Sequence, residues 1–240
     1  DRAGGLLTYG IPGFKLEKDV VMRRNAQLEQ GGVEFRLNCT VGKDIAFKDI
    51  RDAHDAVVIA TGVYKTRGLD IPGNTANGIV DAIDFLTASN RKSFGDAVSE
   101  FDSGALNANG KRVVVIGGGD TAMDCVRTSV RQGATSVKCL YRRDRTNMPG
   151  SQREVQNAEE EGVIFEWQSA PKEFVSDRQV ADAIAQGTPP GNVRGVTVQK
   201  MRLGAPDATG RQTPELIEGS DYFEEAELVI KALGFEPEDL

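Results

Sequence analysis

Short, mostly apolar segments alternate with helical patterns along much of the chain. The clearest apolar segments cover residues 56–60, 112–116 and 228–233, and a glycine follows each of them closely. Segments of this kind are typical of parallel strands that are buried on both faces of a sheet. The pattern also predicts shorter strands at residues 33–38, 136–141 and 163–167.

Helices are expected between several of these strands. Apolar residues at helical spacing predict helices at residues 17–30, 81–88 and 120–132, and glycine follows the first and the last of them. A capping box, Ser-Gln-Arg-Glu, opens a further helix at residues 151–161. Residues 90–109 are polar and poorly patterned, so a loop or an irregular helix is expected there.

The pattern changes in the last third of the chain. Short alternating segments between Gly, Pro and Asp turns predict an antiparallel meander at residues 172–227, with its clearest strand at 193–203. The α/β unit and this meander therefore lie between two apolar strands. These strands end in similar triplets, Ala-Thr-Gly at 60–62 and Ala-Leu-Gly at 232–234. An inserted domain would give this arrangement.

Composition and charge exclude several classes of protein. The 240 residues contain 36 Asp and Glu against 29 Lys and Arg, for a net charge of −7, which disfavours generic binding to nucleic acid. No apolar run approaches the roughly 20 residues of a membrane span. We therefore expect no membrane contact. We also expect no signal peptide, because the chain opens with Asp-Arg-Ala-Gly.

Cysteine and histidine offer little chemistry. Cys39, Cys125 and Cys139 are far apart and form no C-x-x-C pair, which argues against a local iron–sulfur, zinc or dithiol site. We expect all three to be small buried side chains in a reducing cytoplasm. His54, the one histidine, lies in a turn and is expected to be a surface residue. We predict no metal site and name no catalytic residue.

The strongest motif is a glycine turn between a strand and a helix. Residues 113–122 read Val-Val-Val-Ile-Gly-Gly-Gly-Asp-Thr-Ala and match G-x-G-x-x-A with Gly117, Gly119 and Ala122. Missing side chains let the backbone approach a pyrophosphate, and free N–H groups at the helix start face the anion. The motif predicts a dinucleotide site, although a glycine turn without a ligand is the alternative.

The next strand indicates which dinucleotide binds. Sites that prefer NAD usually place a carboxylate at its end, whereas here Tyr141 is followed by Arg142, Arg143, Asp144 and Arg145. Guanidinium groups match a 2′-phosphate in charge and geometry. The sequence therefore favours NADP(H), and a solvated charged loop is the alternative.

These residues resemble the small (beta) subunit family of glutamate synthase. The matching segments are residues 4–12 (Gly-Gly-Leu-Leu-Thr-Tyr-Gly-Ile-Pro), 56–64 (Ala-Val-Val-Ile-Ala-Thr-Gly-Val-Tyr), 113–125, 139–161 and 230–237. The reductase half of dihydropyrimidine dehydrogenase is also similar. The resemblance implies a Rossmann-like flavoprotein fold with two dinucleotide-binding domains, the NADPH domain inserted in an incomplete FAD domain.

The resemblance also implies how the chain is divided and what it does. The expected parts are a partial FAD-binding domain at residues 1–73, an inserted NADP(H)-binding domain at 74–226 and a return strand to the FAD domain at 227–240. NADPH would reduce FAD, and iron–sulfur clusters outside this chain would carry electrons to the large subunit for glutamate synthesis.

The resemblance assigns site residues by their motif positions. Those expected at NADP(H) are Gly117, Gly118, Gly119, Asp120, Thr121, Arg142, Arg143 and Arg145, with Ala232, Leu233 and Gly234 on the nicotinamide side. Those expected to face FAD are Gly5, Leu6, Leu7, Val41, Thr61 and Gly62.

Two departures from the family pattern limit what this chain is expected to do. The family's first glycine fingerprint and its cysteine-rich segment correspond to positions before Asp1, and the family continues beyond Leu240. We therefore expect an internal part of such a protein, inactive by itself and prone to self-association. The other function class is a nucleotide-binding or assembly module without turnover of its own.

Overall fold

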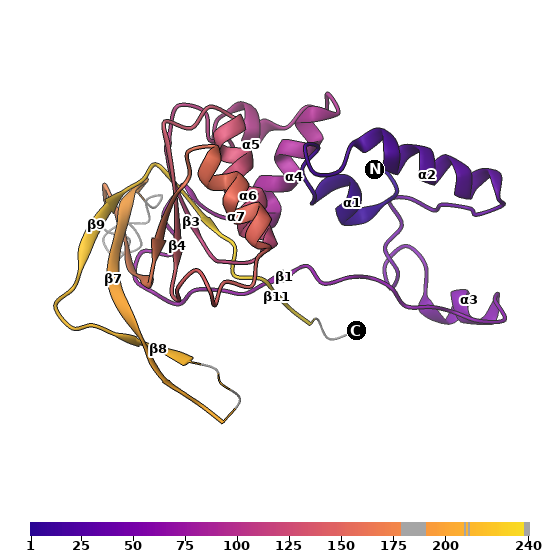
Figure 1. Ribbon diagram of the computed structural model, residues 1–240. Coiled ribbons are helices and arrows are strands. Elements are labelled where there is room, and N and C mark those ends of the chain that lie inside the picture. Colours follow the sequence, from indigo (N-terminus) through magenta and orange to yellow (C-terminus); the bar gives the residue numbers. More distant parts are fainter. Residues whose placement is uncertain (179–190, 209, 211, 238–240) are drawn as a thin grey trace.

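A five-stranded parallel sheet forms the centre of the molecule (Figure 1). The computed structural model describes residues 1–178, 191–208, 210 and 212–237. The strand order is β2-β10-β3-β4-β5. The strands are β2 (Ile79–Asp81), β3 (Arg112–Ile116), β4 (Ser136–Tyr141), β5 (Ile164–Trp167) and β10 (Leu228–Lys231). All their pairings are parallel, which confirms the predicted α/β unit.

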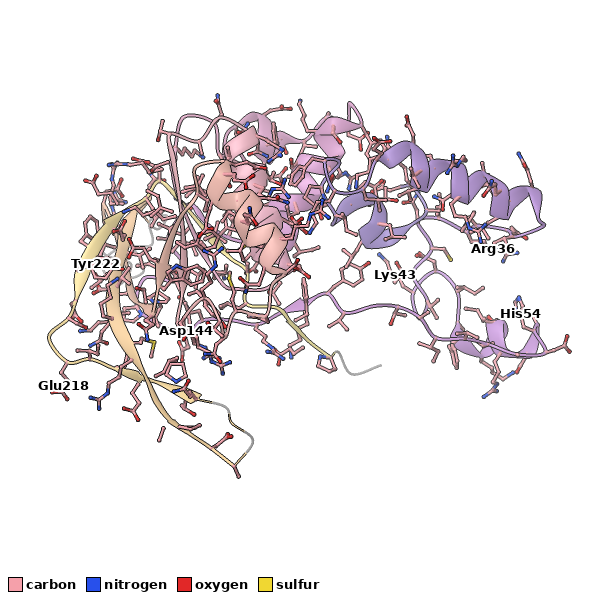
Figure 2. The ribbon with its side chains drawn as sticks, viewed as in Figure 1. Arg36, Lys43, His54, Asp144, Glu218 and Tyr222 are labelled. Atoms are coloured by element: carbon pink, nitrogen blue, oxygen red, sulfur yellow. The ribbon has the colours of Figure 1, made fainter. Side chains whose placement is uncertain are left out.

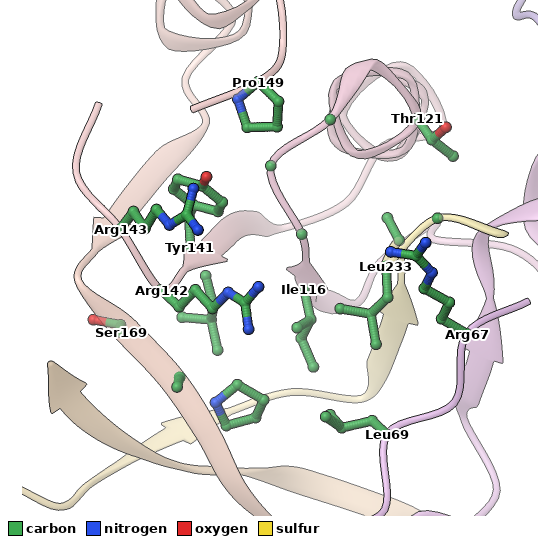
Figure 3. A pocket seen from close by; sticks show the side chains of 18 of the residues that line it. Arg67, Leu69, Ile116, Thr121, Tyr141, Arg142, Arg143, Pro149, Ser169 and Leu233 are labelled. Carbon is green, nitrogen blue, oxygen red and sulfur yellow. The ribbon is translucent and has the colours of Figure 1, made fainter. Parts of the chain in front are cut away.

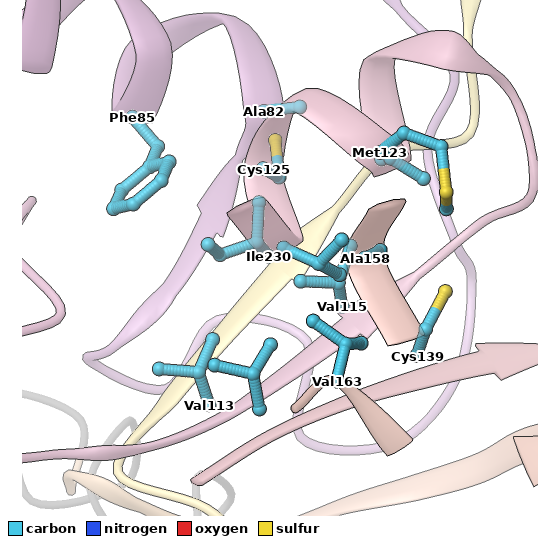
Figure 4. Packing of buried hydrophobic residues seen from close by; sticks show 14 of the residues in the cluster. Ala82, Phe85, Val113, Val115, Met123, Cys125, Cys139, Ala158, Val163 and Ile230 are labelled. Atoms are coloured by element: carbon cyan, nitrogen blue, oxygen red, sulfur yellow. The ribbon is translucent and has the colours of Figure 1, made fainter. Parts of the chain in front are cut away.

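Helices cover one face of this sheet. They are α4 (Ala82–Ser93), α6 (Asp120–Arg131) and α7 (Gln152–Glu160), and α5 (Ser99–Asp102) packs on α4. Because side chains alternate along a strand, Val113 and Val115 of β3 point to the same face. There they join Phe85 and Met123 in the main buried cluster (Figure 4).

A second sheet covers the other face. It is antiparallel and consists of β6 (Ser169–Ser176), β7 (Val193–Pro206), β8 (Gln212–Leu216) and β9 (Tyr222–Glu225). Val114 and Ile116 pack against its Phe174 and Val196 in a second buried cluster. The predicted meander is confirmed, except that residues 179–190, 209 and 211 lie outside the described residues.

The N-terminal segment lies to one side of this layered body (Figure 1). It contains α1 (Gly5–Tyr9), α2 (Lys18–Gln30) and α3 (Phe47–Asp52), of which α1 contacts α4. Strand β1 (Lys65–Thr66) then leads the chain into the body and pairs with β11 (Phe235–Glu236), which leads it out. The strand through which the chain enters the body therefore lies beside the strand through which it leaves.

Two expected strands are absent from the described chain. Residues 33–38 and 56–60 have no strand conformation, so both predictions were wrong. Val58 is 87% exposed and Ile59 58% exposed. A strand forms when a neighbouring strand satisfies its backbone, and no described segment lies beside these residues as a partner strand.

Other expectations were wrong in detail. The helix expected at 81–88 continues to Ser93, and Ser151 makes no side-chain bond that caps α7. Strand β2 was missed because its three residues are too short for a readable pattern. Strand β10 lies inside the parallel sheet, between β2 and β3, and the chain leaves this sheet only after it. The three domain boundaries stay a prediction.

Candidate functional site

A pocket of about 690 Å³ opens at the carboxyl ends of β3, β4 and β10. In doubly wound sheets this edge is where ligands bind. Its lining includes all of the residues expected at NADP(H) except Asp120 and Arg145. These nine residues are Gly117, Gly118, Gly119, Thr121, Arg142, Arg143, Ala232, Leu233 and Gly234. The structure thus brings together segments that are more than 100 residues apart in the sequence.

The first two glycines of the turn pack closely against protein. Gly117 has a φ of 149°, and a Cβ there would lie 2.2 Å from the carbonyl oxygen of Ala232. A Cβ on Gly118 would lie 2.4 Å from the ring of Tyr141. Both positions therefore require glycine because the backbone is enclosed by its own neighbours.

Gly119 differs because its surroundings are open. A Cβ there would meet no described atom within 4 Å, and its φ of −90° and ψ of 178° suit any residue. Gly119 is also the N-cap of α6, a 12-residue helix whose first N–H groups carry partial positive charge. An open backbone at a helix start fits the pyrophosphate of a dinucleotide.

Arginines supply the charge of the pocket. Arg142 and Arg143 both line it, directly after the end of β4 (Figure 3). The Nε atom of Arg143 is buried and has no hydrogen-bond partner among the described residues. A buried donor without a partner is costly, so a bound anion would stabilise this side chain.

Two other residues expected at NADP(H) lie outside the pocket lining. Arg145 Nη1 forms an ion pair with Glu159 Oε1 at 2.7 Å. The Asp120 carboxylate accepts a hydrogen bond from the backbone N–H of Ser151 at 3.1 Å, which fixes the start of α7. Both therefore have contacts within the protein.

The loop after β4 is held against the glycine turn. The Tyr141 hydroxyl donates to the carbonyl of Asn147 at 2.8 Å, and the Gly150 N–H donates to the carbonyl of Gly118 at 2.9 Å. Burial raises the pKa of the Tyr141 hydroxyl, so it stays protonated and keeps donating. Met148, a residue of this loop, is buried. These contacts fix where Arg142 and Arg143 emerge.

The residues expected to face FAD lie in the N-terminal segment, away from this pocket lining. Gly5, Leu6 and Leu7 are in α1. Ideal Cβ atoms on Gly5 and Gly62 would lie 3.5 Å and 3.4 Å from the Tyr64 ring system, so these two segments meet at Tyr64. Thr61 lies in the irregular segment before it. Val41 bridges to Ile45 and is half exposed, as is Leu7.

Cysteine and histidine have the surroundings of non-catalytic residues. Cys125 and Cys139 are buried, and burial raises the pKa of the Cys139 thiol to about 12. Cys39 is exposed, so the expectation that all three are buried was wrong. His54 lies beside α3, far from Asp144 of the pocket loop (Figure 2).

Metal-binding clusters and membrane-spanning helices are both absent from the described residues. No group of three or more His, Cys, Asp or Glu side chains is placed to hold a metal ion among them. None of the described helices is long and apolar enough to cross a membrane.

Sequence reasoning missed part of the pocket. Arg67, Gly68 and Leu69 line it from the segment after β1, and Ser169, Ala170, Pro171 and Met201 line it from the antiparallel sheet. The linker signal at residues 69–74 gave no sign of a binding role. No sequence pattern distinguished Arg67, which precedes that linker.

Comparisons with known proteins agree with this geometry. The pyridine nucleotide-disulphide oxidoreductase family matches residues 19–239. The glutamate synthase (NADPH) small chain of Azospirillum brasilense is 59% identical over the whole chain, which covers 47% of that relative. A protein of Cereibacter sphaeroides, provisionally named as the same small chain, is 69% identical, and the chain covers 54% of it. The chain spans about half the length of these curated relatives.

A solved structure shares the fold. FprA from Mycobacterium tuberculosis, solved in complex with NADPH, superposes with a TM-score of 0.74 at 16% identity. The similarity covers 98% of this chain and 62% of FprA.

Proposed function

Because the chain belongs to the pyridine nucleotide-disulphide oxidoreductase family, we propose that its pocket binds NADPH. We further propose that the chain is the electron-input part of an FAD-containing oxidoreductase of the glutamate synthase small-chain type. The main observation behind this proposal is that the open glycine turn, Arg142 and Arg143 line the same pocket.

Each wall of the pocket would hold a different part of the ligand. Gly119 and the first turn of α6 would bind the pyrophosphate, since both leave backbone N–H groups free. Arg142 and Arg143 would bind the 2′-phosphate through charge-assisted hydrogen bonds. Ala232, Leu233 and Gly234 would lie beside the nicotinamide and orient it.

The cofactors themselves supply the redox chemistry: NADPH provides a hydride and FAD accepts it. The chain would bind and orient NADPH, and none of its residues needs to act as an acid or a base. This agrees with the absence of a histidine at the pocket, since His54 lies in the N-terminal segment.

The residues expected at FAD do not form a complete flavin site in the described chain. Gly5 and Gly62 meet at Tyr64, but Leu7 and Val41 are each 51% exposed. The apolar residues beside them, Val58 and Ile59, are exposed as well. We propose that the longer protein completes this site, and we derive no step through FAD in this chain.

Partner and location follow from the same proposal. The relatives are named small chains, which implies a larger partner chain, and we propose the glutamate synthase large subunit. We propose a cytoplasmic location from the cysteine usage. The domain boundaries at residues 73 and 226 are part of the proposal.

The alternative is a nucleotide-binding or assembly module without turnover. The exposed run at residues 56–60 supports it, because an unpaired apolar segment favours association with another chain. A reductase part of another flavoprotein, similar to dihydropyrimidine dehydrogenase, would share the same pocket.

Absorbance spectroscopy of the purified chain tests the proposal. We expect a colourless protein that binds added NADPH, does not oxidise it with an artificial acceptor, and self-associates in sedimentation. Fusing the missing N-terminal part of a relative should restore flavin absorbance and NADPH oxidation. A yellow protein with stoichiometric flavin and steady NADPH oxidation would contradict the incomplete flavin site. A colourless chain that fails to bind NADPH would contradict the function itself.

A further inference from the structure

The pocket contains a third arginine that the 2′-phosphate does not explain. Arg67 lines it together with Arg142 and Arg143, and none of the described lining residues is acidic. Among the described residues, none of these three arginines forms an ion pair, whereas Arg145 of the same loop pairs with Glu159. By contrast, Arg112 and Arg127 of the same body each contact two glutamates. In a chain of net charge −7, this uncompensated charge favours an anion with more than one phosphate.

The backbone of Arg67 is fixed at the rim of the pocket. Its N–H donates to the carbonyl of Gly234 at 3.0 Å, directly after the two-residue pairing of β1 with β11. The preceding residue, Thr66, donates through its hydroxyl to Asp81 Oδ2 at 3.1 Å, at the end of β2. Arg67 is therefore held beside the segment expected on the nicotinamide side.

Arg67 and Arg142 approach the pocket from different sides. Ile116, which enters the glycine turn, lies between their side chains (Figure 3). Thr121 lies on the Arg67 side of the turn, and Arg143 lies on the other side with Tyr141 (Figure 3). If Arg142 and Arg143 bind the 2′-phosphate, then Arg67 faces the opposite half of the dinucleotide.

We infer that Arg67 binds the pyrophosphate, at the phosphate that carries the nicotinamide ribose. This inference rests on the proposed function and adds a residue to its site. Arg67 would be a general affinity residue for nicotinamide dinucleotides, while Arg142 would select for the 2′-phosphate. The two arginines should then respond differently to ligands that carry different phosphates.

The experiment measures dissociation constants of three ligands for R67Q, R142Q and the wild-type chain by calorimetric titration. NADPH carries the pyrophosphate and the 2′-phosphate, NADH lacks the 2′-phosphate, and 2′,5′-ADP lacks the nicotinamide half. We expect R67Q to raise the dissociation constants of NADPH and NADH by the same factor, about tenfold. Its effect on the dissociation constant of 2′,5′-ADP should be less than about twofold. We expect R142Q to weaken the binding of NADPH and 2′,5′-ADP and to leave the affinity for NADH nearly unchanged.

Two further variants control for charge and folding. R67K keeps the charge and should lose less affinity than R67Q, with the same pattern among ligands. R202Q removes an exposed arginine of β7 that pairs with Glu215 outside the pocket, and all three affinities should match the wild type. Unchanged NADPH binding by R67Q would overturn the inference, and so would a loss confined to NADPH and 2′,5′-ADP. A wild-type chain that binds no dinucleotide would instead overturn the proposed function.

Discussion

The three glycines of the turn have different physical reasons to be glycine. Gly117 is pressed against Ala232, and Gly118 is pressed against Tyr141, so each is needed for the fold. Gly119 has open space and a backbone conformation that any residue can adopt. No described residue packs so closely against Gly119 that it excludes a side chain there. This open space fits a position at which a ligand approaches the backbone.

This difference predicts opposite effects of substitution within one turn. Gly119→Val should abolish NADPH binding, because the branched side chain occupies the space of the pyrophosphate. The chain should keep its wild-type unfolding midpoint. Calorimetric titration measures the first effect and urea unfolding measures the second.

Gly117→Ala is the matched comparison. Its methyl group would collide with the carbonyl of Ala232, so we expect it to lower the free energy of unfolding by about 2 kcal/mol. Normal NADPH binding by Gly119→Val would place the ligand elsewhere, and a Gly117→Ala chain as stable as wild type would argue against the close packing of this turn.

At the scale of elements, a charged cluster joins the N-terminal segment to the body. The loop after α1 places Lys15 Nζ 2.8 Å from Asp124 Oδ1 of α6, and Phe14 lies under the guanidinium of Arg131. Arg127 of α6 donates to Glu161, just after α7, at 2.8 Å. The cluster therefore fixes α6, whose first turn lies at the pocket, against α7 and the preceding segment.

Glu161 gives this cluster a measurable pH dependence. Hydrogen bonds from Arg131 and Arg127 lower its pKa from 4.5 to about 2. A carboxylate with a lowered pKa in the folded state stabilises the fold above its unfolded pKa, and the effect is lost as pH falls toward the folded pKa. Because water screens partly exposed ion pairs, we expect Glu161→Gln to cost roughly 1–2 kcal/mol at neutral pH.

Urea unfolding at several pH values checks this expectation. The difference in stability between wild type and Glu161→Gln should be full at pH 7, shrink below about pH 4.5 and vanish near pH 2. Glu29→Gln, on an exposed part of α2, provides the control and should change stability little at any of these pH values. A difference that stays constant with pH would exclude the ionised carboxylate as its source.

The elements predicted correctly are those whose partners lie in the same unit. Strands β3 and β4 and helix α6 were predictable because their apolar side chains are buried against neighbours in the parallel sheet and its helix layer. The strand expected at residues 56–60 has an equally strong pattern but no partner strand in the described chain. An apolar pattern thus indicates that a segment is suited to burial in a sheet. Whether a strand forms there depends on a neighbouring strand in the tertiary structure.

The same limit applies to the site. The place of the glycine turn and of Arg142 at the pocket could be predicted, because each directly follows the end of a predicted strand. Arg67 could not, since its place at the pocket depends on the pairing of β1 with β11, and these strands are far apart in the sequence.

The whole molecule combines a layered body with an N-terminal segment that exposes many apolar side chains. The body buries its sheet on both faces, whereas Val58 and Ile59 of the segment are 87% and 58% exposed. The pocket belongs to the body, and its lining reaches the segment's connection at Arg67. We therefore expect NADPH binding to survive in this chain even where flavin binding does not.

The central claim is that the body selects NADPH through Arg142 and Arg143. Calorimetric titration of NADPH and NADH against the wild-type chain and an Arg142→Gln/Arg143→Gln variant tests it most directly. Charge-assisted bonds of about 1.5–3 kcal/mol predict that wild type prefers NADPH by roughly ten- to a hundredfold. The variant should bind the two dinucleotides about equally. Equal affinities in the wild-type chain, or an unchanged preference in the variant, would contradict the claim.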